Sequence, residues 1–172
     1  MLVNLSDVFT SQMKEETKEI PIEMTVYKDG ISEYPILEKT PASFTFTSIG
    51  VGKVSVKGNA TVVLQMQCDR CLKEVHQPVQ LQFETEVDSP DVEIDEDDVQ
   101  DFMDNYSLDV EEFINNEILM SLPAKVVCKE DCKGICKVCG NDQNLGECGC
   151  DTFVPDPRMA AIKDIFNANK EV

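Results

Sequence analysis

The chain has 172 residues and a mass of 19.2 kDa, which is enough for one buried core or for one domain with a small appendage. A content of 42% hydrophobic and 28% charged residues is typical of globular proteins and argues against a disordered or membrane-embedded chain. The first twenty residues carry charges in every apolar stretch, and no later run approaches about 18 apolar residues, so we expect neither a signal peptide nor a membrane span. We therefore expect a cytoplasmic protein, in which thiols stay reduced and disulfides are rare.

The net charge of −18 comes mainly from one segment of the chain. Between Glu84 and Glu117 there are fifteen Asp and Glu residues and no Lys or Arg, whereas the rest of the chain carries only −3. Such a segment is typical of a solvated loop that aids solubility. It is equally suited to attract a basic partner or to repel nucleic acid. Both interpretations stay open from composition alone.

The first half of the chain alternates apolar and polar residues, which predicts strands. A short amphipathic helix over residues 6–16, capped by Ser6, comes first. A strand over residues 19–26 follows, and Pro21 favours an edge position for it. The same alternation recurs in four later segments: 43–48, 53–57, 61–66 and 75–87. Three glycines mark turns or bulges between them: Gly50, Gly52 and Gly58.

The alternation ends after Val87, and the next segment is predicted to be a flexible acidic loop. A helix follows it, because Asp109 and Glu112 have the spacing of a capping box and the apolar residues after them recur at helical intervals. Pro123 ends this helix. A last helix is predicted to begin at Asp156, with a proline at its first helical position.

Together these elements predict an α+β fold. We expect an antiparallel β-meander or partly closed barrel with one packed helix, a cysteine-rich zinc-knuckle segment and a C-terminal helix. Four regions follow one another along the chain. They are a mainly β domain at 1–87, an acidic flexible loop at 88–107, a helix packed on the sheet at 108–123, and a cysteine-rich metal-binding segment with the C-terminal helix at 124–172.

Eight cysteines fall into four close pairs, and six of the eight lie within residues 128–150. Zinc takes about four soft ligands in a tetrahedron, and a tight turn with two cysteines supplies half of such a set. Gly140 and Gly149 remove side chains that would resist the turns beside their cysteines. The pairs are Cys68 with Cys71, Cys128 with Cys132, Cys136 with Cys139, and Cys148 with Cys150.

The four pairs divide into two expected zinc sites. Closing a short loop costs the least chain entropy, so one site is predicted from the last four cysteines: Cys136, Cys139, Cys148 and Cys150. The remaining four would form a second, long-range site that ties the sheet to the start of the cysteine-rich segment: Cys68, Cys71, Cys128 and Cys132. Structural zinc is the favoured interpretation. Redox or disulfide switching and metal-free thiols stay open, because C-x2-C spacing also occurs at redox sites.

No other group of residues in the sequence indicates catalysis. The single histidine, His76, falls on the polar face of a predicted strand, where an exposed side chain is the simplest interpretation. The chain contains no Gly-rich phosphate loop, no nucleophile elbow and no histidine–acid pair. We therefore expect a protein that is not an enzyme and takes no small-molecule substrate.

Several motifs occur in a specific order along the chain. They are C-D-R-C-L at 68–72, a helix that ends in Leu-Pro at 109–123, C-K-E-D-C-K-G-I-C-K-V-C-G at 128–140, C-G-C at 148–150 and D-P-R at 156–158. This order resembles the YceD-type family, the large ribosomal RNA subunit accumulation proteins. Lys137 stands where a proline often occurs in that family, and the departure leaves the cysteines intact.

The resemblance implies a cytoplasmic bacterial factor that supports accumulation of 23S rRNA, in rRNA processing, stability or large-subunit assembly, without an established enzymatic activity. The charge favours action through protein contacts, since an acidic segment suits a basic ribosomal protein or a pre-50S particle, whereas −18 opposes binding to phosphates. Two alternatives stay open: thiol redox sensing, and direct contact with 23S rRNA through a basic patch of Lys125, Lys129, Lys133, Lys137, Arg158 and Lys163. We expect no membrane partner.

Overall fold

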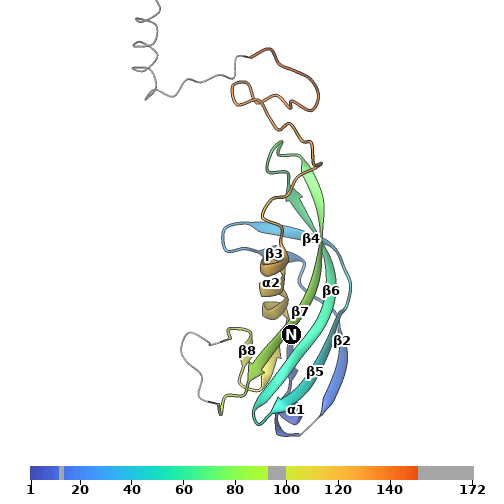
Figure 1. Ribbon diagram of the computed structural model, residues 1–172, viewed down its shortest axis with the longest axis vertical. Coiled ribbons are helices and arrows are strands. Elements are labelled where there is room, and N and C mark those ends of the chain that lie inside the picture. The colour runs from blue at the N-terminus through green and yellow to red at the C-terminus, as the bar shows by residue number, and fades with distance from the viewer. Residues whose placement is uncertain (12–13, 93–99, 151–172) are drawn as a thin grey trace, which may run out of the picture.

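The computed structural model describes residues 1–11, 14–92 and 100–150 (Figure 1). Within these ranges the chain forms nine strands and two helices. The elements are β1 (Leu2–Asn4), α1 (Ser6–Thr10), β2 (Glu15–Ile20), β3 (Val26–Lys28), β4 (Glu33–Lys39), β5 (Ala42–Gly50), β6 (Lys53–Gln67), β7 (Glu74–Asp88), β8 (Met103–Asp104), β9 (Ser107–Asp109) and α2 (Val110–Ser121). No helix in the described ranges is long and apolar enough to cross a membrane.

The long hairpin of β6 and β7 is the central feature of the main sheet. Its two strands pair antiparallel over 15 residues, from Lys53 opposite Asp88 to Gln67 opposite Glu74. The other edge of β6 pairs first with β5 and then with β4, which completes a six-stranded sheet with β2 and β3 outermost. The hairpin runs along the length of the molecule, and its tip lies beside the cysteine-rich segment (Figure 1).

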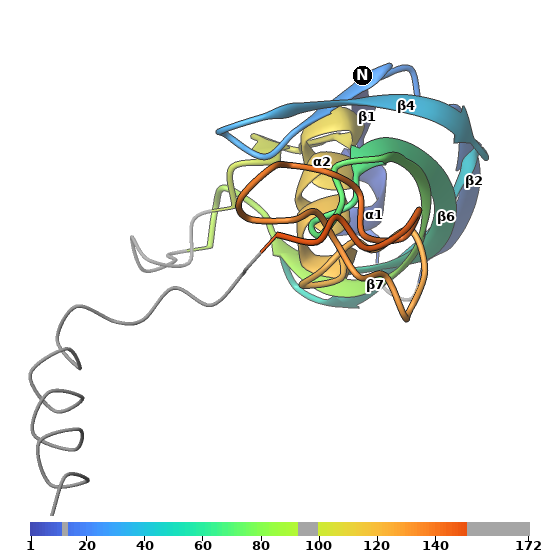
Figure 2. The same cartoon turned by 90° about the horizontal axis from the view of Figure 1, so that it is seen from above.

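The sheet curves around α2, so that sheet and helix enclose one core (Figure 2). The alternating residues of the predicted strands point inward, and aromatic rings fill the centre. Phe44 of β5 lies 5.0 Å from Phe83 of β7 and 5.7 Å from Phe113 of α2, measured between ring centroids. Such tilted aromatic pairs favour one arrangement of the helix on the sheet. The fold is therefore mostly antiparallel β-sheet with helices, within the predicted α+β class.

The helix α2 begins where the D-x-x-E pattern predicts. Asp109 is the N-cap, and its carboxylate accepts hydrogen bonds from the backbone N–H groups of Glu111 and Glu112. These bonds satisfy two donors that the first turn of a helix leaves free. The helix ends at Ser121, two residues before Pro123, and buries four apolar side chains: Val110, Phe113, Ile114 and Ile118.

Gly58 lies in the middle of β6, and not at a turn or bulge as the sequence analysis predicted. It pairs with Phe44 on one side and with Phe83 on the other. A Cβ atom at this position would lie 1.9 Å from the carbonyl oxygen of Ser43 and 2.7 Å from the Phe83 ring. Glycine therefore allows the Phe83 ring to cross β6 at close range.

The N-terminal elements differ from the prediction. The helix α1 covers only Ser6–Thr10, and Glu15 and Glu16 of the predicted helix belong to strand β2. Pairing with β5, from Glu15 opposite Thr47 to Ile20 opposite Ala42, overrides the local helical pattern. The predicted strand at 19–26 is also interrupted, because β2 ends at Ile20 and Pro21 has no N–H to continue the ladder.

Part of the predicted acidic loop at 88–107 forms ordered structure. Strands β8 and β9 pair with each other, and β9 pairs with β1 at the N-terminus, where Leu108 is fully buried. This sheet joins residues about a hundred positions apart, so no local alternation could reveal it. Residues 93–99 of the loop and the predicted C-terminal helix that begins at Asp156 lie outside the described residues.

Candidate metal centres

The eight cysteine sulfurs gather into two groups of four. We call one group the hairpin cluster, which consists of Cys68, Cys71, Cys128 and Cys132. The other is the loop cluster, which consists of Cys136, Cys139, Cys148 and Cys150. Within each group all four sulfurs lie within 4.8 Å of one another, and each group can hold a metal ion. These are the same two groups that the sequence analysis predicted from the entropy cost of closing loops.

The hairpin cluster joins two distant parts of the chain. Its first two cysteines lie at the tip of the β6–β7 hairpin, and its other two follow α2. Asp69 and Val126 bind each other twice: the Asp69 N–H donates to the Val126 carbonyl at 2.9 Å, and the Val126 N–H donates to the Asp69 carboxylate at 2.8 Å. The segment after α2 is thereby held against the hairpin tip.

The two C-x2-C turns have the same backbone hydrogen bonds. In the first, the Leu72 N–H donates to the Cys68 carbonyl and the Cys68 N–H donates to the Lys73 carbonyl, at 2.9 and 2.8 Å. In the second, Gly140 and Asn141 make the matching bonds with Cys136, both at 2.8 Å. Equal spacing thus gives equal turns in two unrelated settings, a strand hairpin and a loop.

The residue after each C-x2-C pair adopts the left-handed conformation. Gly140 has φ +75°, as the sequence analysis anticipated. Its counterpart in the first turn is Leu72, at φ +62°, with a side chain that is 58% exposed. A residue with a Cβ atom loses about 1–2 kcal/mol in this conformation. The turn therefore forms in spite of the leucine, which indicates that its other interactions determine its shape.

The distances between sulfurs are those of separate thiols and suit a tetrahedral ion. Sγ atoms lie 3.8 Å apart in the Cys68–Cys132 pair and 3.5 Å apart in the Cys71–Cys128 pair. A disulfide requires about 2.05 Å. Four sulfurs at about 2.3 Å from a zinc ion lie about 3.8 Å from one another. All eight cysteines are free thiols in the structure.

Ionisation of the hairpin cluster is unequal among its thiols. Burial raises the pKa of Cys68, but the N–H groups of Cys128, Arg70 and Cys71 outweigh it and bring the pKa to about 6. Burial and the three neighbouring thiols raise the pKa of Cys128 to about 12. Four thiolates this close repel one another unless a cation joins them, so protons remain on part of the group without one.

The thiols of the loop cluster also differ in how readily they ionise. The N–H groups of Cys139 and Val138 bring the pKa of Cys136 to about 6, and the Val138 N–H lies 3.4 Å from the Cys136 sulfur. The neighbouring thiols of Cys139 and Cys148 raise the pKa of Cys150 to about 12. In both turns the first cysteine is thus prepared as a thiolate by N–H groups two and three residues later.

Arg70, which lies between the first two cysteines of the hairpin cluster, binds the backbone of the segment that carries Cys132. Its guanidinium donates to the carbonyl of Cys132 at 2.9 Å and to that of Glu130 at 3.2 Å. Its own carbonyl accepts from the N–H of Ile135 at 3.1 Å, and a Cβ atom on Gly134 would lie only 2.9 Å from that oxygen. Arg70 therefore positions the backbone that carries Cys132 toward the hairpin tip.

The lysines near the cysteines are exposed, as is His76. Lys129 pairs with Asp131 at 3.7 Å, and Lys73 pairs with Asp142 at 2.6 Å. Sequence reasoning missed four residues that support the clusters, which are Asp69, Lys73, Asp142 and Asn144. The only local signal was the polar run N-D-Q-N at 141–144, because the partners of these side chains lie elsewhere in the chain.

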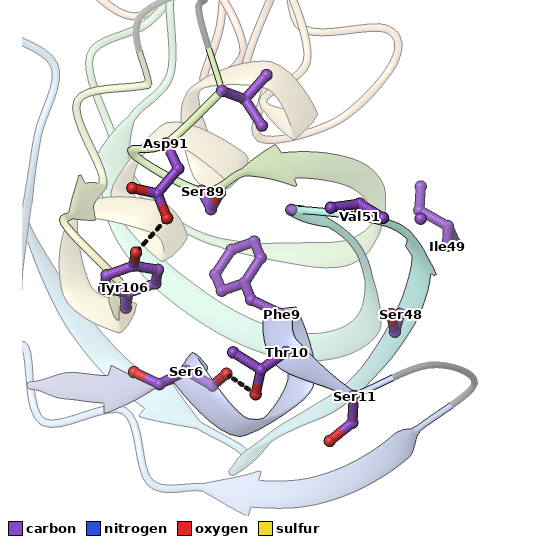
Figure 3. Close-up of a pocket in the computed structure, with 13 residues that line it drawn as sticks. Ser6, Phe9, Thr10, Ser11, Ser48, Ile49, Val51, Ser89, Asp91 and Tyr106 are labelled. Atoms are coloured by element: carbon purple, nitrogen blue, oxygen red, sulfur yellow. Dashed lines mark hydrogen bonds between the residues drawn. The ribbon is translucent and has the colours of Figure 1, made fainter.

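A cavity of about 740 Å³ lies between α1 and the β5–β6 turn (Figure 3). These elements are at the opposite end of the molecule from the cysteine-rich segment (Figure 1). Phe9, Ile49 and Val51 contribute apolar surface to it, and the Val51 side chain is 90% exposed. Of the described residues that line it, Asp91 is the only charged one, and it accepts a hydrogen bond from the Tyr106 hydroxyl. The cavity thus combines an apolar lining with one negative charge.

Comparison with known proteins places the chain in a family. The sequence pattern of the family described as large ribosomal RNA subunit accumulation protein YceD matches residues 56–166, which include α2 and all eight cysteines. The uncharacterized protein ML1660 of Mycobacterium leprae (strain TN) is 33% identical over 91 residues, a stretch that covers 51% of this chain and 42% of that relative. No solved structure matches the chain significantly. The chain belongs to the YceD family of large ribosomal RNA subunit accumulation proteins.

Proposed function

We propose that the protein is a non-enzymatic cytoplasmic factor that supports accumulation of 23S rRNA by aiding assembly of the large ribosomal subunit. The family match over residues 56–166 carries this proposal, since the family is described by its role in accumulation of the large-subunit RNA. The matched region contains both cysteine clusters. The clusters therefore belong to the part of the chain that the family shares.

Each cluster binds one zinc ion in this proposal, and the ions have a structural role. All eight cysteines serve as ligands: Cys68, Cys71, Cys128 and Cys132 at the hairpin cluster, and Cys136, Cys139, Cys148 and Cys150 at the loop cluster. Sets of four cysteines without an open position are typical of structural zinc, not catalytic zinc. The sulfur distances and the N–H groups directed at Cys68 and Cys136 support the assignment.

The partner is a basic ribosomal protein or a pre-50S particle that presents one. The chain has a net charge of −18, and each zinc ion with four thiolates carries a further charge of about −2. Lysine- and arginine-rich segments of such a protein would be attracted by this negative charge, whereas RNA phosphates would be repelled by it. The cavity with Asp91 offers an apolar patch next to a carboxylate, which also suits a basic segment with apolar residues.

Direct contact with 23S rRNA is the second candidate function. It is favoured by four exposed lysines in the cysteine-rich segment: Lys125, Lys129, Lys133 and Lys137. Acidic residues in the same segment oppose it, among them Glu130 and Asp131, and the latter already pairs with Lys129. Protein contacts therefore remain the proposed route.

Binding measurements on the full-length, zinc-loaded protein separate the two routes. We expect it to bind basic large-subunit proteins, with affinity that falls as salt rises, and to bind a 23S rRNA fragment much more weakly. Tight, strongly salt-dependent binding to the RNA fragment alone would favour the direct route. Purification under reducing conditions without zinc, together with reversible disulfide formation, would favour thiol redox sensing instead. In cells depleted of the protein, the ratio of 23S to 16S rRNA should fall, and the family role would be excluded for this chain if it did not.

A further inference from the structure

Asn144 belongs to one cluster by its place in the chain and to the other by its contacts. It lies between Cys139 and Cys148, inside the loop that the loop cluster closes. Its side-chain Nδ2 nevertheless donates to the Sγ atom of Cys132, in the hairpin cluster, at 3.4 Å. Its Oδ1 accepts a hydrogen bond from the N–H of Lys133 at 2.9 Å. One side chain from the loop that carries the loop cluster thus reaches a sulfur of the hairpin cluster.

The orientation of the Asn144 amide is determined by its neighbours. The second donor of Nδ2 is directed at Asp142 Oδ1 at 2.7 Å, and the Asn144 backbone N–H donates to the same oxygen at 2.9 Å. A reversed amide would place its oxygen against a carboxylate and a sulfur, and its NH₂ group against the Lys133 N–H. Every polar atom of the amide would then lose its partner. Lys73, directly beyond the first C-x2-C turn, holds the other Asp142 oxygen at 2.6 Å.

Backbone bonds place this loop on the link between the clusters. The Gln143 N–H donates to the carbonyl of Gly134 at 2.9 Å, and Ile135 and Asp142 form an isolated β-bridge. The link is only three residues long, because Cys132 ends one cluster and Cys136 begins the other. Closing the loop at Cys139 and Cys148 therefore also positions Asn144 against Cys132.

We propose that Asn144 couples the two clusters, so that zinc bound at the loop cluster raises the zinc affinity of the hairpin cluster. The inference rests on the proposed zinc binding. By linkage, zinc at the hairpin cluster raises the affinity of the loop cluster by the same factor. The physical cause is the N–H donor that Asn144 supplies to the charged Cys132 sulfur, which is held in place only while the loop is closed.

The coupling factor follows from zinc affinities of the full-length, reduced protein, measured by competition with a chromophoric chelator. Cys139→Ser with Cys148→Ser disables the loop cluster and gives the hairpin affinity alone, and Cys128→Ser gives the loop affinity alone. The coupling factor is the overall two-zinc constant of the intact protein divided by the product of these two affinities. Asn144→Ala is tested in each background. Asn141→Ala is the matched control, because the Asn141 side chain makes no hydrogen bond within the described part of the chain.

We expect a coupling factor of about 5 to 150 for the intact protein, the range usual for coupled sites, and a value near one with Asn144→Ala. Asn141→Ala should leave the factor unchanged. A factor near one in the intact protein, or an undiminished factor with Asn144→Ala, would overturn the coupling while two bound zinc ions would still support the metal sites. Failure of either cluster to take up zinc would overturn both the proposed zinc binding at two sites and the coupling between them.

Hydrogen exchange supplies a second readout that needs no substitution of Asn144. The Lys133 N–H, which donates to Asn144 Oδ1, should exchange at least about fivefold faster when the loop cluster is disabled and the hairpin cluster holds zinc. Unchanged protection of this amide would show that the loop stays docked without its own metal, and the coupling would be refuted. A rise in exchange at Lys133 without any rise in the β6–β7 strands supports it.

Discussion

Replacing one exposed ligand of each cluster tests whether the hairpin cluster stabilises the whole fold. Cys128 and Cys139 are both exposed, so a serine at either position removes a ligand with little loss of packing. Cys128 lies 57 residues from Cys71, its neighbour in the cluster, whereas Cys139 is separated from Cys148 by a loop of only eight residues. Of these two pairs of ligands, only Cys71 and Cys128 join the β6–β7 hairpin to the chain beyond α2.

The size of the effect follows from the loops that the metal closes. A cross-link over 57 residues removes about 4 kcal/mol of chain entropy from the unfolded state, and one over about ten residues removes about 2.6 kcal/mol. The second contribution is confined to the loop itself, which reaches the hairpin tip through side-chain contacts such as that of Asp142 with Lys73. For a chain of this size, a loss of about 4 kcal/mol lowers Tm by about 8–16 °C.

Thermal unfolding in excess zinc and reductant, followed by far-UV circular dichroism, measures both variants against the parent protein. We expect Cys128→Ser to show the full decrease in Tm and Cys139→Ser a clearly smaller one. Hydrogen exchange should rise throughout β6 and β7 in the first variant and mainly in residues 133–150 in the second. Equal decreases in Tm, or a larger decrease with Cys139→Ser, would refute the assignment of the global role to the hairpin cluster.

The structure supports four further predictions. Arg70→Lys should lower the zinc affinity of the hairpin cluster about 10- to 100-fold in chelator competition, because the lysine ammonium ends closer to the backbone than the Arg70 Nη1 that donates to both carbonyls. An unchanged affinity would remove Arg70 from the support of the site. Leu72→Gly should raise the free energy of unfolding by about 0.5–1 kcal/mol in urea, since glycine relieves the left-handed strain at φ +62°, and a loss of stability would contradict this. Gly58→Ala should lower the free energy of unfolding by about 1–3 kcal/mol, because the added Cβ atom clashes with the Ser43 carbonyl. An unchanged free energy of unfolding would mean that β6 can shift at this position. Zinc uptake by the hairpin cluster at pH 7.5 should release at least about two protons, measured by calorimetry in buffers of different ionisation enthalpy, because the pKa values of Cys71 and Cys128 are raised. The zinc affinity of the cluster should fall as pH falls, and release of no protons would contradict the pKa pattern.

The C-x2-C turns were predictable because their hydrogen bonds close within five residues. The Cys136 turn with Gly140 could be read directly from the sequence, and φ +75° at that glycine agrees. The Cys68 turn has the same bonds around Leu72, a residue that propensity alone would not place there. The division into a short-range and a long-range cluster also follows from the sequence, since it needs only the spacing of the cysteines.

The supporting residues were not predictable, because their partners lie far away in the chain. Asp69 meets Val126 across 57 residues, and Lys73 meets Asp142 only after the loop has folded back onto the hairpin tip. Asn144 looks like an ordinary loop residue until the fold brings Cys132 beside it.

The sequence by itself therefore determined the alternating strands, the capped helix α2 and the pairing of sulfurs within each turn, because each depends on neighbours a few residues apart. Tertiary structure determined which of the locally predicted elements form in the folded protein. Glu15 and Glu16 became part of a strand because β5 offered hydrogen bonds to them, and residues 107–109 formed strand β9 because β1 lay alongside. A contact between single side chains far apart in the chain leaves no pattern in the sequence, so only the folded chain shows that Asn144 contacts Cys132 of the hairpin cluster and the Lys133 N–H.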